Sequence, residues 1–175
     1  MSSIGLHLAI TLFLLASFLR DDKFKTALLL LPFGLLSDLD SFVGIHRATL
    51  HNLFVVFIPL FLMVILKFLN VKIKDRYFIL ASLLLFSHIF FDAFYNGVFL
   101  FYPFSKESYN LMFWFGLKET GLNLIFNLKI PGKVGEVVYV VTPTPSVPEI
   151  PIIESGTELL ILIFSFIAFF LRFYK

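Results

Sequence analysis

The chain of 175 residues contains no cysteine, and only 15% of its residues are charged. The absence of cysteine excludes disulfides and thiolate metal sites. The net charge is +2 and no basic cluster stands out, so we expect no nucleic-acid partner. Apolar residues instead make up 59% of the chain, 25 residues are phenylalanine, and the mean hydropathy is +0.94. Because soluble domains are nearer half apolar and a quarter charged, this composition predicts a helical integral membrane protein.

Most of the apolar residues lie in five segments, at about residues 4–19, 26–36, 49–69, 77–96 and 158–171. We therefore predict an all-α integral membrane protein with about five transmembrane or re-entrant helices and a partly extended extracytoplasmic segment. Residues 1–105 would form the helical membrane core. Residues 106–156, which are rich in aromatic and mixed-charge sequence and then in proline, would form an extracytoplasmic or interfacial segment. Residues 157–175 would form a C-terminal transmembrane helix.

Lysine and arginine are concentrated at residues 20–25, 72–76 and 172–175, which this topology places on one side of the membrane. The positive-inside rule makes that side cytoplasmic. We therefore expect a multi-pass protein of the inner (plasma) membrane with its N-terminus outside. The polar stretch at residues 37–51 would face the extracytoplasmic side.

The segment at residues 26–36 is too short to cross a bilayer. At about 1.5 Å per residue it covers roughly half of a ~30 Å hydrocarbon core. Pro32 and Gly34 loosen it further. The chain is therefore expected to reach Asp38 and Asp40 while still inside the outer leaflet, where irregular backbone is tolerated only beside protein or a wet cavity.

Polar side chains gather at this predicted depth. They are His7, Asp38, Asp40, His46, Arg47 and His51, together with His88 and Asp92 on the fourth segment. His88 and Asp92 are four residues apart, so they share one face of a helix. Carboxylates and imidazoles are costly away from water unless they have a partner. Since both are ligands that suit zinc and similar divalent ions, the sequence predicts a metal site in the outer leaflet.

Simpler interpretations exist for the single residues. His7 could donate a hydrogen bond to a neighbouring helix, and Asp38 could belong to the last turn of a helix. His46 and Arg47 could be interfacial charges, and His88 with Asp92 could form an internal hydrogen-bonded pair. The joint pattern at one predicted depth is what favours a metal site.

The order of these motifs resembles a known family. The motifs are His7, then Leu-Leu-Ser-Asp38-Leu-Asp40-Ser, then His46-Arg47-x-Thr-x-His51, then Ser-His88-x-x-x-Asp92, then Tyr102-Pro103-Phe104. In this combination, over about residues 1–105, the chain resembles the membrane-bound metal-dependent hydrolases, a family of LexA-regulated inner-membrane proteins. The order of Asp and His ligands is also similar to that of the zinc-dependent phospholipase C and single-strand nuclease superfamily.

This resemblance implies a set of ligands. Asp38 or Asp40, with His51, His88 and Asp92, would bind one metal ion, and His7 would help to bind a second one bridged by Asp92. The chain departs from the family pattern at Ser37, where proline is usual, at Ala48, where glycine is usual, and at Asn52, where serine is usual. No histidine follows His88, so the third metal site of the phospholipase group has no counterpart. We expect one or two ions, with zinc favoured.

The resemblance implies a hydrolase that cleaves a phosphoester or phosphodiester of a lipid-like substrate by metal-activated water. Bound zinc would lower the pKa of a water to about 7. Asp38 or Asp40 would orient that water or act as the base, Arg47 would pair with a phosphate, and His46 would support a ligand. A site inside the leaflet makes membrane lipid both the environment and the expected substrate.

Two other functions are compatible with the same residues. A divalent-cation transporter needs polar groups through the full depth of the membrane, whereas residues 53–66 carry no polar side chain, so the site resembles a dead end. A non-catalytic protein with a structural metal is the second alternative. Structural sites are closed by four protein ligands, whereas catalytic sites keep one position open.

Overall fold

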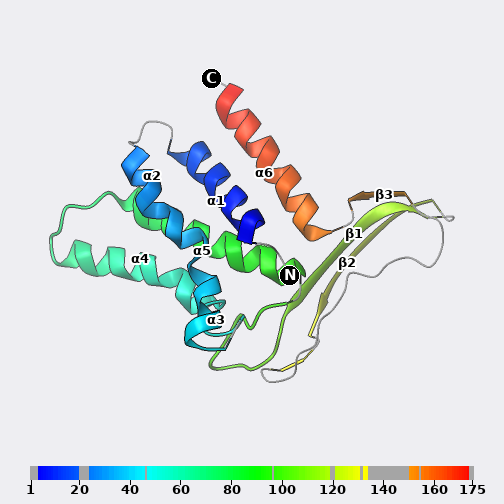
Figure 1. Cartoon of the computed structure of the whole chain (residues 1–175), viewed down its shortest axis with the longest axis horizontal. Helices are drawn as coiled ribbons and strands as arrows, with labels where there is room; N and C mark the ends of the chain where they lie inside the picture. The colour runs from blue at the N-terminus through cyan, green and yellow to red at the C-terminus, as the bar shows by residue number, and fades with distance from the viewer. Residues whose placement is uncertain are drawn as a thin grey trace.

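The structure, a computed structural model, describes residues 4–19, 24–45, 47–95, 97–118, 121–130, 132–133, 150–153 and 155–173. The helices are α1 (Ile4–Phe18), α2 (Phe24–Leu30), the 3₁₀ turns η1 (Leu31–Gly34) and η2 (Leu36–Leu39), α3 (Asp40–Val43), α4 (Leu53–Phe68), α5 (Asp75–Tyr95) and α6 (Gly156–Phe173). The strands are β1 (Asn110–Lys118), β2 (Gly121–Lys129) and β3 (Ile150–Ile153). Figure 1 shows the helices gathered at one end of the molecule and the strands at the other end.

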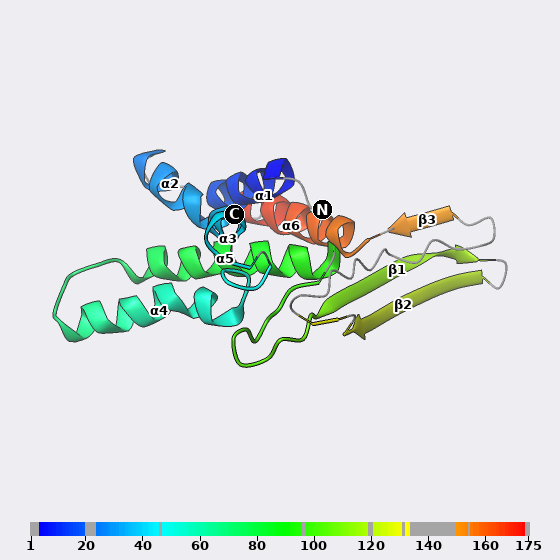
Figure 2. The same ribbon diagram turned by 60° about the horizontal axis from the view of Figure 1, so that its bottom comes forward.

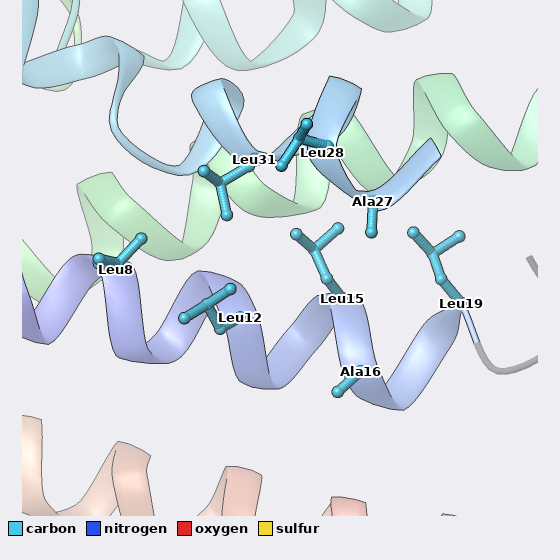
Figure 3. A pocket seen from close by; sticks show the side chains of 8 residues that line it. All are labelled: Leu8, Leu12, Leu15, Ala16, Leu19, Ala27, Leu28 and Leu31. Carbon is cyan, nitrogen blue, oxygen red and sulfur yellow. The ribbon is translucent and has the colours of Figure 1, made fainter. Parts of the chain in front are cut away.

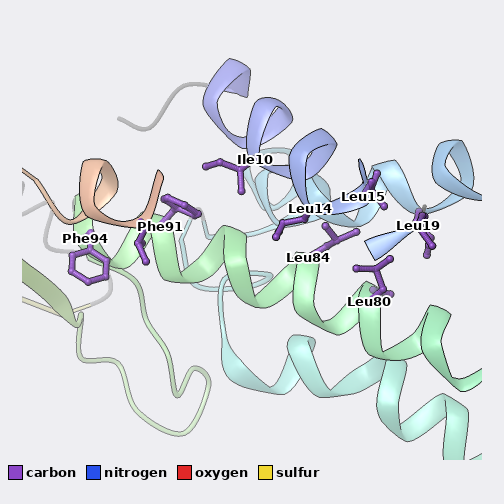
Figure 4. Close-up of a cluster of buried hydrophobic side chains, with 11 residues drawn as sticks. Ile10, Leu14, Leu15, Leu19, Leu80, Leu84, Phe91 and Phe94 are labelled. Carbon is purple, nitrogen blue, oxygen red and sulfur yellow. The ribbon is translucent and has the colours of Figure 1, made fainter. Parts of the chain in front are cut away.

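Helix α5 lies at the centre of the helical part, with α4 on one side and α1 and α6 on the other (Figure 2). Its face toward α1 and α6 carries Leu80, Leu84 and Phe91, which join Leu14 and Leu15 of α1 in one buried cluster (Figure 4). Its face toward α4 carries a second buried stripe at helical spacing, formed by Leu85, Ile89 and Ala93. Because α5 is covered on both of these faces, it holds the other helices in place.

The segment after α2 leaves the α-helix at the position where the sequence predicts loosening. Pro32 stands in the first turn of η1, and two 3₁₀ turns then lead to Asp38 and Asp40. Gly34 packs directly against α1, where a Cβ atom on residue 34 would overlap the Thr11 side chain. A glycine is therefore needed for the chain to approach α1 closely enough to run back along α5.

Helix α4 begins at a buried side-chain cap. The Asn52 side chain accepts a hydrogen bond from the Val55 N–H at 3.1 Å and donates to the carbonyls of Ala48 and Thr49, both at 2.9 Å. One amide therefore both starts α4 and fixes the turn that precedes it. His51 lies in that turn, so the cap also positions a candidate ligand.

The all-α prediction is wrong, because β2, β1 and β3 form an antiparallel sheet in that order. Along β1 the residues alternate: Asn110, Met112 and Trp114 are buried, while the residues between them are partly exposed. This period of two is typical of a strand with one covered face, and the aromatic content of the segment masked it. Residues 134–149, which hold most of the prolines of the predicted extracytoplasmic segment, lie outside the described residues.

The prediction of a multi-pass protein with about five transmembrane or re-entrant helices is also wrong. Among the described residues, only Asp75–Phe94 in α5 forms a helix long and apolar enough to cross a membrane. Helices α1 and α4 have 15 and 16 residues. They would cover only about 22 and 24 Å of a ~30 Å core. The division into parts at residues 105 and 156 stays a prediction.

The outer face of α4 is apolar, although no other part of the chain that the structure describes covers it. Phe57, Phe61 and Phe68 expose 57%, 68% and 86% of their surface. Contiguous apolar surface of this kind is typical of a membrane-facing or partner-facing side.

The cap of α4 gives a first testable prediction. We expect Asn52→Ala to destabilise the protein by about 1–2 kcal/mol, because the Val55 N–H and two carbonyls lose their partner. Asn52→Asp keeps the acceptor for Val55 but turns a buried carboxylate oxygen toward the Ala48 and Thr49 carbonyls, so its loss should be at least as large. Thermal unfolding in detergent, followed by circular dichroism, measures both. Asn123→Ala, which removes a local bond to the Gly121 carbonyl in the hairpin, is the control and should change little. Equal stability of Asn52→Ala and wild type would contradict the role of the cap.

Candidate metal centre

Four side chains from three separate segments meet beside α5. Asp38 comes from η2, His51 from the turn before α4, and His88 and Asp92 from α5. One nitrogen or oxygen atom of each lies within 4.8 Å of the others, which is compact enough to hold a metal ion. The helical spacing of His88 and Asp92 supplies one side of this cluster, and the irregular segments supply the other.

The separations within the cluster fit a tetrahedral ion. The Nε2 atom of His88 lies 3.4 Å from the Asp38 Oδ1 atom, and the Nε2 atom of His51 lies 3.2 Å from the Asp92 Oδ2 atom. The His51 Nε2 atom and the Asp38 Oδ1 atom are 3.9 Å apart. Ligand bonds of 2.0–2.2 Å in a tetrahedral zinc site place neighbouring ligand atoms about 3.3 Å apart. The donor atoms therefore already stand close to the spacing that such an ion requires.

Both imidazoles are held by their other nitrogen. The Nδ1 atom of His51 lies 2.7 Å from the Asp40 carboxylate, and the Nδ1 atom of His88 lies 2.8 Å from the Gly34 carbonyl. An Nδ1–H that donates to each acceptor leaves the Nε2 lone pair for a metal, which is the usual arrangement around ligating histidines. The Nε2 atom of His88 is buried and has no hydrogen-bond partner in the described part of the chain. A metal ion fits this site because it would satisfy that atom.

Asp40 supports the cluster from behind. Its carboxylate faces His51 and also accepts a hydrogen bond from the Leu50 N–H at 3.3 Å. Asp40 is completely buried, and its role is to orient the His51 ring.

Asp92 is shared between several positively charged or hydrogen-bonding groups. Its Oδ1 atom lies 3.3 Å from the His7 Nε2 atom, and its Oδ2 atom faces His51 and lies 3.7 Å from the Arg47 Nη2 atom. The His7 ring also stacks on the His88 ring with a centroid separation of 3.8 Å. His7 therefore links α1 to both α5 residues of the site.

Arg47 adopts a backbone conformation that is uncommon for a side-chain-bearing residue, with φ = 65°. Its carbonyl accepts a hydrogen bond from the Phe99 N–H, and its guanidinium donates to the Gly97 carbonyl at 3.1 Å. Left-handed backbone at such a residue costs about 1–2 kcal/mol. The surrounding contacts hold this conformation and keep the guanidinium beside Asp92, which is typical of a functional position.

The cluster is buried on most sides and opens at Asp38. His51, His88 and Asp92 are at most 2% exposed, whereas the Asp38 side chain is 25% exposed. Burial would raise the pKa of Asp38, but the neighbouring His88 ring, and after it His7, lower that pKa below its usual range. Asp38 is therefore an ionised carboxylate at the accessible edge of the site.

The pKa of His51 is shifted in the opposite direction from that of Asp38. Burial by itself lowers the pKa of this imidazole, but hydrogen bonds to the Asp40 and Asp92 carboxylates, and their charges, raise it to about 9. Without a metal, His51 is therefore protonated at neutral pH. A metal ion must displace the Nε2 proton, because the Nδ1 proton stays with Asp40.

The residues predicted from the sequence occupy distinct positions. Asp38, His51, His88 and Asp92 form the cluster, Asp40 lies behind His51, and His7 and Arg47 lie against Asp92. His46 lies outside the described residues. The Gly34 and Gly97 carbonyls, which hold His88 and Arg47, were missed because a backbone acceptor leaves no side-chain signal in a sequence.

The YdjM inner membrane protein family matches residues 1–175, so the chain belongs to that family and is a membrane protein. No curated protein and no solved structure shows significant similarity to the chain. The orientation predicted from the positive charges stays a prediction.

The geometry predicts how metal affinity divides among these residues. We expect His88→Ala and Asp92→Asn to weaken zinc binding at least 100-fold, because each removes a ligand. Asp40→Asn should weaken it about 10- to 100-fold, the usual effect of removing a group that orients a ligand. Isothermal titration of the purified protein in detergent with Zn²⁺ measures these affinities. Asp75→Asn, in the exposed Lys67–Asp75 ion pair, is the matched control and should leave the affinity unchanged.

The pKa of His51 predicts a linked proton release. Near pH 7 we expect about one proton to leave the protein for each zinc ion bound, and zinc affinity should rise with pH until about pH 9. Titrations in buffers of different ionisation enthalpy give the number of protons released. Asp40→Asn should reduce that number at pH 7, since it removes one of the charges that raise the His51 pKa. Zinc binding without proton release at pH 7 would show that His51 is already neutral before zinc binds, which would contradict the raised pKa.

Proposed function

We propose that this member of the YdjM inner membrane protein family is a metal-dependent hydrolase that cleaves a phosphoester or phosphodiester of a membrane lipid. The observation that carries the proposal is the four-residue cluster, in which two oriented histidines face two carboxylates at separations of 3.2–3.9 Å. A divalent ion such as zinc supplies Lewis acidity, which generates a nucleophile from water at neutral pH. The similarity of motif order to the zinc-dependent phospholipases favours phosphorus as the electrophile, by analogy.

The exposed edge of the site determines where the substrate would arrive. Asp38 is the accessible member of the cluster, so a scissile bond would approach past this carboxylate. The ionised Asp38 side chain would accept a hydrogen bond from the attacking water and orient it. Asp40 cannot take this role, since it is buried against His51.

Arg47 would bind the phosphate. Its guanidinium lies on the edge of the site with 11% of the side chain exposed, and its planar fork suits two oxygens of a phosphoryl group. The same guanidinium balances the charge of Asp92 before substrate arrives. His7, on the other oxygen of Asp92, would keep that carboxylate oriented.

A structural metal site is the second candidate. The specific observation in its favour is that the chain offers four ligands to one ion and that three of them are buried. Structural sites are closed by four protein ligands in this manner. The partial exposure of Asp38 favours the hydrolase, because a ligand at an open edge can make room for water or substrate.

A hydrolysis assay distinguishes the two candidates. Purified protein with Zn²⁺ or Mn²⁺ should hydrolyse bis(4-nitrophenyl) phosphate, measured by release of 4-nitrophenolate. We expect His88→Ala and Asp92→Asn to lower kcat/KM at least 100-fold and Asp75→Asn to leave it unchanged. A structural site would instead give zinc-dependent thermal stability with no turnover. Turnover that survives both ligand substitutions would show that the activity comes from elsewhere.

A further inference from the structure

An apolar groove runs between α1 and α2, on a face of α1 next to the one that carries His7. Its lining residues are Leu8, Leu12, Leu15, Ala16, Leu19, Ala27, Leu28 and Leu31, and its volume is about 560 Å³ (Figure 3). Every lining side chain is aliphatic. Volumes of 300–1,000 Å³ are typical of sites for small molecules, but such sites usually include a few polar groups, so this groove suits a purely hydrocarbon ligand.

Helix α1 carries two adjacent stripes at helical spacing. His7, Thr11 and Leu14 are buried toward α5 and η1, where His7 meets Asp92. The second stripe consists of Leu8, Leu12, Leu15 and Leu19. Its first three residues each directly follow a residue of the first stripe, and Leu19 lies one turn beyond Leu15. The groove and the metal centre are therefore built on neighbouring faces of one helix, and both begin at residues 7 and 8.

The opposite wall also starts at the metal centre. Leu31 opens η1, and η1 ends at Gly34, whose carbonyl holds the His88 ring. Helix α2, which precedes η1 in the chain, forms the rest of this wall with Leu28 and Ala27 (Figure 3). Both walls thus converge on the residues that position the candidate ligands, and the groove leads away from them.

The length of the groove matches one leaflet of a membrane. From Leu8 to Leu19 the helix rises about 16 Å, which is half of the ~30 Å hydrocarbon core of a bilayer. Leu14, Leu15 and Leu19 pack in the same buried cluster as Leu80 and Leu84, so the groove runs beside the candidate membrane span in α5 (Figure 4). A hydrocarbon chain that extends through one leaflet has this length and direction.

We propose that the groove holds one acyl chain of the lipid substrate while the phosphoester of that lipid lies at the metal centre. This inference rests on the proposed hydrolase function and adds to it the place where the long alkyl or acyl chain of the lipid phosphate ester binds. The groove contributes affinity and position, because burial of apolar surface is favourable in proportion to its area. It takes no part in the cleavage itself.

Two matched esters test the proposal. The probes are methyl 4-nitrophenyl phosphate and dodecyl 4-nitrophenyl phosphate, which share a scissile bond and differ in chain length. We expect wild type to prefer the dodecyl ester at least tenfold in kcat/KM. Leu12→Trp and Leu28→Trp, which fill the groove, should lower kcat/KM for the dodecyl ester at least tenfold and leave the methyl ester unchanged.

The control variant is Leu62→Trp on α4. Leu12 and Leu62 are 50% and 45% exposed, so both substitutions add the same bulk to a half-exposed helical position. Leu62→Trp should change neither ester. Equal effects of all three variants on the dodecyl ester, or no effect of Leu12→Trp and Leu28→Trp, would overturn the groove as the chain site.

A binding measurement separates failure of the groove from failure of the hydrolase proposal. If neither ester is cleaved, the hydrolase function is wrong. Native mass spectrometry with dipalmitoyl phosphatidylglycerol still reports on the groove: bound lipid should be lost in Leu12→Trp and retained in Leu62→Trp. Equal lipid retention in both would overturn the inference. A wild-type dimer that Leu12→Trp converts to a monomer, with unchanged ester preference, would overturn it by showing that a second copy fills the groove.

Discussion

The buried carboxylate of Asp92 is the constraint on which the rest of the structure depends. An aspartate that is 1% exposed on an apolar helix is unfavourable unless positive or hydrogen-bonding groups surround it. His7, Arg47 and His51 supply those groups from α1, from the turn after α3 and from the turn before α4. Two segments that are distant in the sequence, α1 and the loop between α3 and α4, are thereby fixed against α5 through one side chain.

The irregular segment between α2 and α4 follows from the same requirement. A continuous helix could not bring Asp38 and Asp40 back to α5, and Pro32 with Gly34 ends the helix at the necessary place. Irregular backbone exposes carbonyl groups, and here one of them is used: the Gly34 carbonyl accepts a hydrogen bond from His88. The segment that is costly to build is thus the segment that orients the site.

The sequence predicted the site more completely than the fold. Spacing alone places His88 and Asp92 on one helical face, and the cost of burying charge indicates that Asp38 and His51 must meet them. The division of labour between Asp38 and Asp40 could not be predicted, because it depends on how two 3₁₀ turns rotate residues that are two apart.

The sheet was missed for a related reason. Phe113, Trp114 and Phe115 are apolar on both faces of β1, so the alternation that identifies a strand is hidden in the sequence although it is clear in the burial. The number of membrane-crossing helices was overestimated since apolar composition alone does not show that α1 and α4 stop after 15 and 16 residues.

The arrangement of charge argues that the site serves a function beyond folding. A helix junction that only had to be stable could be packed with apolar side chains, and replacement of buried ion pairs by such residues is often neutral or stabilising. Here two buried carboxylates, three histidines and an arginine in a left-handed conformation occupy the junction instead. The accessible carboxylate of Asp38 stands at one edge, and an aliphatic groove begins beside His7. A polar centre that could hold a metal ion and an aliphatic groove that leads away from it are the two parts that chemistry on an amphiphilic substrate requires.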